Sequence, residues 1–254
     1  MDNPPKAFED SEFLQSPEGR PVRILSEYER VKAMFEFNKI IDTITFFGST
    51  RFKSREDNPS SNEIDIENSE YYEQARSLAF KFTIWAKEFS KSHNRFVIAT
   101  GGGPGIMEAA NRGAIEAKGK SIGLGIRLPQ EQKNNQYITP ELSIQFHYFF
   151  MRKFFLTQTA KATIMFPGGF GTLDELSEIL TLKQTGRIQQ PLPIVLVGKK
   201  YWSKAINFDY FVERKVINKE DLNLFLMTDY IDQAFEFVSC ILKEKCLDNP
   251  ALHI

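Results

Sequence analysis

The sequence predicts an α/β fold in which a mostly parallel sheet is covered by helices on both faces. Strand-like segments alternate with segments whose apolar residues recur every three or four positions, and this alternation is typical of parallel sheets. Several strand segments are continuous apolar runs, as expected for strands that are buried on both faces. Glycine-bearing turns follow three strands, after Phe47, Thr100 and Phe166. Because ligands of open parallel sheets bind beyond the carboxyl ends of the strands, these turns indicate a ligand site.

Composition excludes several classes of protein. The 254 residues, 42% hydrophobic and 26% charged, are sufficient for one large core. A net charge of −1 gives no reason to expect a nucleic acid or an anionic membrane as partner. No run approaches the ~20 apolar residues of a membrane span, and the polar N-terminus is unlike a signal peptide. With only Cys240 and Cys246, we expect reduced thiols and a cytoplasmic location.

The chain divides into three predicted parts. Residues 1–42 form an N-terminal extension, in which a proline-containing arm over 1–20 precedes a helix over 22–41. Residues 43–245 form a single nucleotide-binding domain, and 246–254 form a C-terminal tail. The 23 phenylalanines of the whole chain indicate either a dense aromatic core or a large interface between subunits.

Each element of the domain is predicted from its apolar pattern. The first half contains strands at 44–48, 96–99 and 121–126, helices at 71–92 and 106–118, a polar insertion at 53–69 and a polar loop at 129–140. The helix at 71–92 is the clearest of these, because Tyr72, Ala75, Ala79, Phe82 and Phe89 form one wide apolar stripe. The second half contains a β-leaning segment at 143–150, strands at 163–166, 192–197 and 224–227, and helices at 151–160, 202–215 and 231–245.

The segment 162–181 is the most informative stretch of the chain. Its apolar strand ends at Pro167, which cannot donate a hydrogen bond to a neighbouring strand. Gly168, Gly169 and Gly171 follow, and then a helical pattern begins at Leu173. A glycine turn at a helix N-terminus presents backbone N–H groups to solvent, and such groups bind phosphate.

Three acids, Asp174, Glu175 and Glu178, lie in the first two turns of that helix. First-turn acids complement the helix dipole, and this explanation is sufficient for Asp174 and Glu178. Thr172 and Glu175 also have the spacing of a capping box. Three glycines directly before them are not needed for a cap, so we expect Glu175 to face a ligand.

The ligand predicted from these turns is a mononucleotide. The turn at 101–105 lacks the G-x-G-x-x-G fingerprint, because Ile106 stands where the last glycine belongs and Arg127, not an acid, follows the next strand. The chain has no P-loop and no zinc-ligand spacing, so no metal is expected. Arg152 lies just before the strand at 163–166 and suits a bidentate grip on an anion, whereas Lys153 is equally explained as a surface side chain.

These residues resemble the LONELY GUY (LOG) family, once labelled lysine decarboxylase-like. The hallmark P-G-G-x-G-T-x-x-E of that family stands here as residues 167–175, the second glycine motif as 101–108, and the resemblance covers about 44–243. It implies a Rossmann-like three-layer fold, a homodimer or higher homo-oligomer, and hydrolysis of the N-glycosidic bond in nucleoside 5′-monophosphates such as AMP or cytokinin riboside 5′-monophosphate. No cofactor is implied. A pyridoxal phosphate decarboxylase would need a Schiff-base lysine, which the motif lacks.

The resemblance also assigns residues. The catalytic Arg and Glu of the family correspond to Arg152 and Glu175. The expected substrate-binding residues are Gly48, Ser49, Gly102, Gly103, Lys153, Pro167, Gly168, Gly169, Gly171 and Thr172. The short family form has Met-His-x-Arg-Lys where this chain has Phe149 to Lys153, so the chain resembles a longer subgroup and its base preference is open.

Two other functions fit the same fold. One is a non-catalytic carrier or sensor that binds a nucleotide or a pterin cofactor, and the other is an enzyme that acts on a different ribosyl phosphate. Glu175 distinguishes the carrier, because a protein that only binds gains nothing from a carboxylate beside the sugar.

Overall fold

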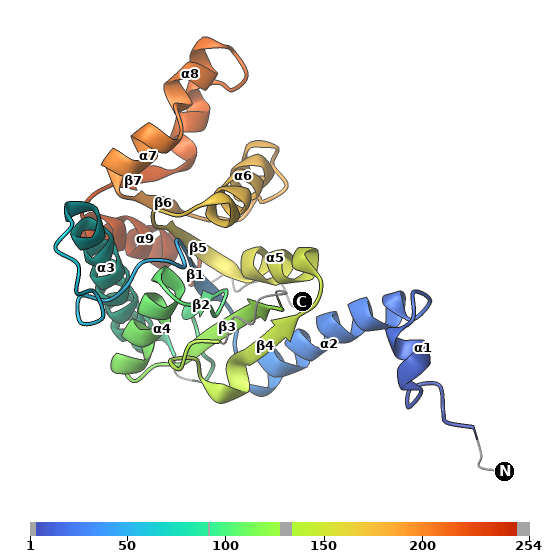
Figure 1. The fold of residues 1–254 in the computed structure, drawn as a ribbon. Helices are drawn as coiled ribbons and strands as arrows, with labels where there is room; N and C mark the ends of the chain where they lie inside the picture. Colours follow the sequence, from blue (N-terminus) through green and yellow to red (C-terminus); the bar gives the residue numbers. More distant parts are fainter. Residues whose placement is uncertain (1–3, 91, 128–133, 248–254) are drawn as a thin grey trace.

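The computed structural model describes residues 4–90, 92–127 and 134–247, and it confirms the predicted α/β class with a Rossmann-like, three-layer arrangement (Figure 1). Seven parallel strands form one sheet in the order β4-β3-β2-β1-β5-β6-β7. The strands are β1 (Thr43–Phe47), β2 (Val97–Thr100), β3 (Ser121–Ile126), β4 (Ser143–Phe146), β5 (Ala160–Met165), β6 (Ile194–Val197) and β7 (Leu226–Thr228).

The order of the strands creates a crevice in the middle of the sheet. The chain builds outward from β1 to β4, crosses back and builds outward again from β5 to β7. β1 therefore pairs with β2 on one side, where Ile44 is opposite Ile98, and with β5 on the other, where Ile44 is opposite Ala162. The connections leave β1 and β5 in different directions, so a ligand crevice is expected at the carboxyl ends of these strands.

Helices cover both faces of the sheet. The helices are α1 (Ser11–Gln15), α2 (Arg20–Phe37), α3 (Glu63–Ala86), α4 (Ile106–Glu116), α5 (Phe149–Gln158), α6 (Phe170–Gln184), α7 (Lys199–Ala205), α8 (Phe208–Glu213) and α9 (Ile231–Lys245), with short 3₁₀ turns η1 (Lys87–Phe89), η2 (Pro140–Leu142) and η3 (Lys219–Leu224). Buried residues of α3, α4 and α9 share one hydrophobic cluster with the sheet, and those of α2, α5, α6 and α7 share the other. None of the described helices is long and apolar enough to cross a bilayer.

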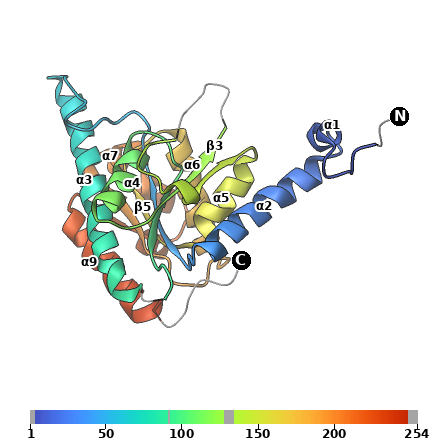
Figure 2. The same ribbon diagram turned by 90° about the horizontal axis from the view of Figure 1, so that it is seen from below.

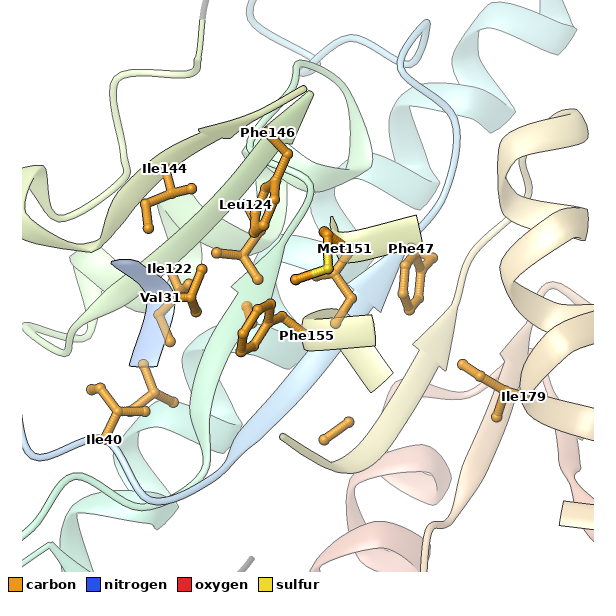
Figure 3. Close-up of a cluster of buried hydrophobic side chains, with 14 of the residues drawn as sticks. Val31, Ile40, Phe47, Ile122, Leu124, Ile144, Phe146, Met151, Phe155 and Ile179 are labelled. Atoms are coloured by element: carbon orange, nitrogen blue, oxygen red, sulfur yellow. The ribbon is translucent and has the colours of Figure 1, made fainter. Parts of the chain in front are cut away.

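The hydrophobic cluster on the α5 face packs α5 against the sheet (Figure 3). Phe155 of α5 packs against Phe146 of β4 with ring centroids 6.2 Å apart, and Met151 lies beside it toward Phe47. Val31, Met34 and Phe35 of α2 belong to the same cluster, whereas α1 and the first turns of α2 extend away from the body (Figures 1 and 2). The division of the chain at residue 42 stays a prediction.

Two predicted helices were wrong because asparagine side chains cap helices at positions that the apolar pattern does not mark. α3 begins at Glu63, within the predicted insertion at 53–69, because the side chain of Asn62 accepts a hydrogen bond from the Ile64 N–H at 2.9 Å. The predicted helix at 202–215 is two helices, α7 and α8. Asn207 separates them, and its side chain caps α8 by accepting from the Tyr210 N–H at 3.0 Å.

The aromatic stretch before β5 was also misplaced. Phe149 and Phe150 begin α5 and do not continue a strand, and β5 starts at Ala160, where the predicted helix was still running. Short apolar runs cannot be assigned to helix or strand by periodicity alone. Part of the polar loop predicted at 129–140 lies outside the described residues. Its last residue, Pro140, begins η2.

The contact between α3 and α4 gives a test of the fold. A methyl group on Gly113 of α4 would lie 2.0 Å from the carbonyl oxygen of Arg76 in α3, so the two backbones touch there. We expect Gly113→Ala to lower the free energy of unfolding by about 1–3 kcal/mol or more, because neither backbone can yield locally. Ile115→Ala, on the half-exposed face of α4, is the control and should cost less. Chemical denaturation of both variants measures the difference, and equal stabilities would contradict the close packing.

Candidate functional site

A cleft of about 680 Å³ opens at the carboxyl ends of the central strands. All three predicted glycine turns contribute to its wall, together with the N-terminal parts of α5, α6 and α7. Its lining comprises Phe47, Gly48, Ser49, Thr50, Arg51, Phe52, Gly101, Gly103, Met107, Gly125, Ile126, Asn134, Phe149, Arg152, Leu156, Gly168, Gly169, Phe170, Gly171, Thr172, Glu175 and Tyr201.

The three turns are bonded to one another through the turn after β1. The N–H of Ser49 donates to the carbonyl of Pro167 at 2.9 Å, which joins this turn to the turn before α6. The carbonyl of Ser49 accepts from the N–H of Ile106 at 3.0 Å, which joins it to the start of α4. Gly105 makes this approach possible, because a methyl group there would lie 2.2 Å from the Ser49 carbonyl oxygen. The wall of the cleft is therefore one connected unit.

The turn before α6 leaves N–H groups open to the cleft. Gly169 is the N-cap of α6 and provides no side-chain cap, and the N–H groups of Gly169, Phe170 and Gly171 donate no hydrogen bond within the described part of the chain. Methyl groups built on Gly169 and Gly171 would meet nothing within 4 Å, so packing does not require glycine at either position. Their missing side chains leave room in front of a helix N-terminus, where an anion is stabilised.

The predicted capping box was wrong, because Thr172 lies within α6 and Gly169 is its N-cap. α6 starts at Phe170, three residues earlier than the apolar pattern indicated, so Thr172 lies in its first turn and does not precede the helix. A methyl group on Gly168 would lie 2.1 Å from the Thr172 Oγ1, so Gly168 is required for the turn to close over that side chain. The carbonyl of Gly168 accepts from the Tyr201 hydroxyl at 2.6 Å, which fixes the turn from the side of α7.

The turn after β2 is held by buried amides. Gly102 has a φ of +73°, which glycine adopts without strain, and its N–H donates to the Thr100 hydroxyl at 2.9 Å. The fully buried Asn111 accepts from that hydroxyl at 2.7 Å, and Asn135 donates to the carbonyls of Gly102 and Gly103. Gly103 lines the cleft, whereas Gly102 shapes the turn behind it.

Arg152 and Glu175 meet at the centre of the cleft. The Arg152 Nη2 lies 3.9 Å from the Glu175 Oε1, and the side chains are only 18% and 3% exposed. The Arg152 guanidinium also packs over the Phe149 ring, 4.9 Å from its centroid, and reaches the turn after β2, where a methyl group on Gly101 would lie 3.9 Å from its Nη1. The Arg152 Nε and the Glu175 Oε2 are buried without a hydrogen-bond partner. Unsatisfied buried polar atoms are rare in native proteins, and a catalytic role of the pair is one explanation for them.

Burial governs the protonation of Glu175. Loss of water raises the pKa of its carboxyl from 4.5 to about 7, against the opposing charges of Arg152 and Lys153. The carboxyl is therefore present in both protonation states near neutral pH. A carboxyl with a pKa in this range can hold or release a proton during a reaction, and perturbed groups of this kind concentrate at functional sites.

Lys153 lies beside the cleft and does not line it. Its ammonium pairs with Asp174 at 2.9 Å and with Glu178 at 2.7 Å, so it links α5 to the outer face of α6. Pro167 and Gly102 also contribute through the shape of the turns and do not form the surface of the cleft. The predicted residues that do line it are Gly48, Ser49, Gly103, Arg152, Gly168, Gly169, Gly171, Thr172 and Glu175. Among residues 4–90, 92–127 and 134–247, no three His, Cys, Asp or Glu side chains are placed so that they could hold a metal ion together.

Sequence reasoning missed several residues of the lining. Arg51 was not predicted, although its position in the turn after Phe47, two residues after Ser49, was a usable signal. Met107, in the first turn of α4, had the same kind of signal. Tyr201 and Asn134 had none, because they reach the cleft from α7 and from the segment before η2 by tertiary contacts alone.

Comparison with known proteins connects this geometry to a family. A family model described as "possible lysine decarboxylase" matches residues 107–238, which is more than half of the chain. The chain belongs to this family, the LOG family. The matched region contains Arg152, Glu175 and the entire P-G-G-x-G-T-x-x-E motif, whereas Gly48, Ser49, Gly102 and Gly103 precede it.

Individual relatives of this LOG-family protein have two kinds of name. It is 35% identical over 78 residues to the probable cytokinin riboside 5′-monophosphate phosphoribohydrolase LOG4 of rice (Oryza sativa subsp. japonica), and this segment spans 31% of the chain and 34% of the rice protein. Two solved structures share the fold at 18% identity over 80% of this chain and 98% of theirs. They are the molybdenum cofactor binding protein of Rippkaea orientalis, with a TM-score of 0.50, and the Moco carrier protein of Chlamydomonas reinhardtii, with 0.52.

The raised pKa of Glu175 predicts a pH dependence of stability. A carboxyl whose pKa is higher in the folded state than in the unfolded state stabilises the fold below about pH 4.5, and this contribution is lost as pH rises through about 7. Glu175→Gln removes the titration. We therefore expect the variant to gain about 1–3 kcal/mol relative to wild type between pH 4.5 and pH 8.5. Asp174→Asn, whose side chain is 58% exposed, is the control. Denaturant titrations at both pH values measure the change, and parallel curves for wild type and Glu175→Gln would contradict the burial.

Proposed function

We propose that this LOG-family protein hydrolyses the N-glycosidic bond of nucleoside 5′-monophosphates, AMP or cytokinin riboside 5′-monophosphate, to the free base and ribose 5-phosphate. The observation that carries the proposal is the Glu175 carboxyl, which is buried in a cleft whose lining also includes free N–H groups and apolar side chains. The rice relative is named for this activity, and the hallmark motif of the family lies at the cleft.

In this proposal the phosphate occupies the space in front of α6. The N–H groups of Gly169, Phe170 and Gly171 would donate to its oxygens, and the positive end of the helix dipole adds to the attraction. Ser49 and Gly103 from the other two turns lie on the same wall. The base would occupy an apolar part of the cleft, whose lining includes Met107, Ile126, Phe149 and Leu156. The ribose would then lie over Glu175.

Cleavage of the bond between C1′ and the base nitrogen leaves the electron pair on the base and builds positive charge on the sugar. The ionised Glu175 carboxylate would stabilise that charge and take a proton from the water that attacks C1′, as carboxylates do in glycoside hydrolases. The departing base gains a proton, so one water is consumed for each bond broken. The pKa of about 7 lets Glu175 accept this proton and release it again near neutral pH.

Arg152 would hold the substrate and the carboxylate together. Its guanidinium lies 3.9 Å from Glu175 and lines the cleft, so its N–H groups can donate a hydrogen bond to a bound ligand. Its charge also opposes the rise in the pKa of Glu175, which keeps part of the carboxyl ionised at neutral pH. Lys153 supports the same effect from outside the cleft by its own charge.

The alternative is a carrier that binds a nucleotide or a pterin cofactor without reaction. The names of the two solved structures favour it, since they share this fold. A carrier needs the anion seat, by which we mean the space in front of the N–H groups of Gly169, Phe170 and Gly171. It does not need a buried carboxyl of raised pKa beside the sugar, because an ionisable group there costs binding energy. The release of free base distinguishes the two functions directly.

The proposal includes the oligomeric state of the protein and its location in the cell. α5 exposes Phe150 and Phe154 by 49% and 40%, and Phe149, which lines the cleft, by 51%; such aromatic surface supports a homodimer or a higher homo-oligomer. Both cysteines are free, Cys240 exposed and Cys246 buried, which fits a cytoplasmic protein.

The first test replaces the carboxyl. Glu175→Gln keeps the shape of the side chain but cannot accept a proton, so we expect release of adenine from AMP to fall by about 10²–10⁴-fold while AMP still binds. Asp174→Asn, one residue earlier and on the exposed side of α6, should turn over as wild type does. Chromatography of free base from AMP, GMP, CMP and isopentenyladenosine monophosphate gives the rates and the base preference. Normal turnover by Glu175→Gln would exclude its catalytic role.

The second test fills the anion seat. Gly171→Ala adds a methyl group to open space, so the protein should fold with undiminished stability, because alanine favours helix more than glycine. The methyl group would crowd the bound phosphate, and we expect the dissociation constant for AMP to rise about 10-fold or more. Ser177→Ala, on the exposed side of the same helix, is the control. Calorimetric titration measures binding, and unchanged affinity for AMP in Gly171→Ala would place the phosphate elsewhere.

A further inference from the structure

The cleft has an unbalanced positive charge that the proposed reaction does not use. Among the described residues that line it, the charged side chains are Arg51, Arg152 and Glu175. Arg152 and Glu175 face each other at 3.9 Å, so their charges largely offset one another. Arg51 is exposed and forms no ion pair within the described part of the chain. It is the charge in the cleft that remains available to a ligand.

The backbone places Arg51 beside the anion seat. Its N–H donates to the Ser49 hydroxyl at 3.1 Å, and Ser49 is itself bonded to Pro167. The two turns touch, since a methyl group on Gly168 would lie 3.0 Å from the carbonyl carbon of Gly48. On the other side, the Cα of Thr50 would lie 2.8 Å from a methyl group on Gly105. Arg51 therefore emerges from a short loop that is fixed between the other two glycine turns.

A phosphate monoester needs more charge than the turn before α6 supplies. Its charge at neutral pH is about −1.5 to −2, whereas a helix N-terminus contributes the equivalent of roughly +0.5. Arg152 cannot make up the difference without leaving Glu175 uncompensated. A guanidinium can, because its planar fork donates two parallel hydrogen bonds to phosphate oxygens.

We propose that Arg51 binds the phosphate group of the ligand and makes the cleft selective for nucleoside 5′-monophosphates over nucleosides. The identity of the nucleoside rests on the proposed function, but the recognition of a phosphate monoester does not. Arg51 supplies the full positive charge, and the N–H groups of Gly169, Phe170 and Gly171 supply direction. Selective binding of a phosphate monoester requires both contributions.

Arg55, four residues later, is the matched control. It lies in the same connecting segment, its side chain is 65% exposed, and it pairs with Glu70 at 3.6 Å. It does not line the cleft. A general effect of surface charge on anion attraction would be the same for both arginines, whereas direct binding depends on Arg51 alone.

The experiment compares Arg51→Ala with Arg55→Ala by calorimetric titration of AMP, adenosine and ribose 5-phosphate. Arg51→Ala should weaken AMP and ribose 5-phosphate about 10- to 100-fold, the loss of charge-assisted hydrogen bonds, and leave adenosine binding as in wild type. Arg55→Ala should bind all three as wild type does. Arg51→Gln keeps the length of the side chain without its charge and should behave like Arg51→Ala; it replaces Arg51→Ala if that variant unfolds.

Three results would overturn the proposal. They are unchanged binding of AMP in both Arg51 variants, an equal loss for AMP and adenosine, and a wild-type protein that binds neither AMP nor ribose 5-phosphate. Hydrolysis is not part of the readout, so the two proposals fail separately. A protein that binds AMP through Arg51 without releasing base would contradict the proposed hydrolysis and support the role of Arg51.

Discussion

The site depends on two backbone hydrogen bonds made by Ser49. Its N–H bonds to Pro167 and its carbonyl accepts from Ile106, so one residue connects the turns that follow β1, β2 and β5. Gly105 and Gly168 allow the close approach, since a side chain at either position would collide with the neighbouring turn. A rigid wall of this kind holds N–H groups in fixed directions without help from the ligand, which lowers the cost of ordering on binding.

The Arg152–Glu175 pair is stable only as part of this wall. Burial of the two charged side chains costs hydration free energy, and their attraction at a separation of 3.9 Å offsets part of it. The remaining cost appears as the raised pKa of Glu175 and as the two polar atoms without partners. Phe149 shields one side of the guanidinium and Lys153 adds charge from outside.

Much of the fold could be predicted because strand and helix periods alternate clearly. β3 and α9 have the predicted bounds, and the three glycine turns meet as their positions after strands required. The errors came where local chemistry overrides periodicity. Asn62 starts α3 inside a stretch with little apolar pattern, and Asn207 starts α8 inside a stretch whose apolar pattern predicts one continuous helix. Phe149 and Phe150 suit a strand by composition but are helical in context. Thr172 was expected to precede α6, because nothing in the apolar pattern marks Phe170 and Gly171 as its first turn.

For the site, the sequence indicates the turns and the acid but not the surface of the cleft. Gly48, Gly169, Arg152 and Glu175 belong to contiguous motifs and could be found, whereas Tyr201 enters from a helix that begins 24 residues after the end of the glycine motif at Glu175. Lys153 shows the opposite case, since it is next to Arg152 in sequence but points to the acids on the outer face of α6. Adjacent residues of a helix differ by about 100° in direction, so adjacency in a motif does not imply a shared role.

The pairing of β1 with β5 has a consequence for synthesis of the chain. Thr43 and Thr159, whose hydroxyls lie 3.3 Å apart where these strands begin, are separated by 116 residues. While the ribosome is still making the first half of the domain, β1 has a partner on one side alone, and the turn after it has no Pro167 to bond. The nascent polypeptide can therefore form a half-sheet early, but it has no competent cleft until the late strand is inserted, and long-range closure of this kind slows folding.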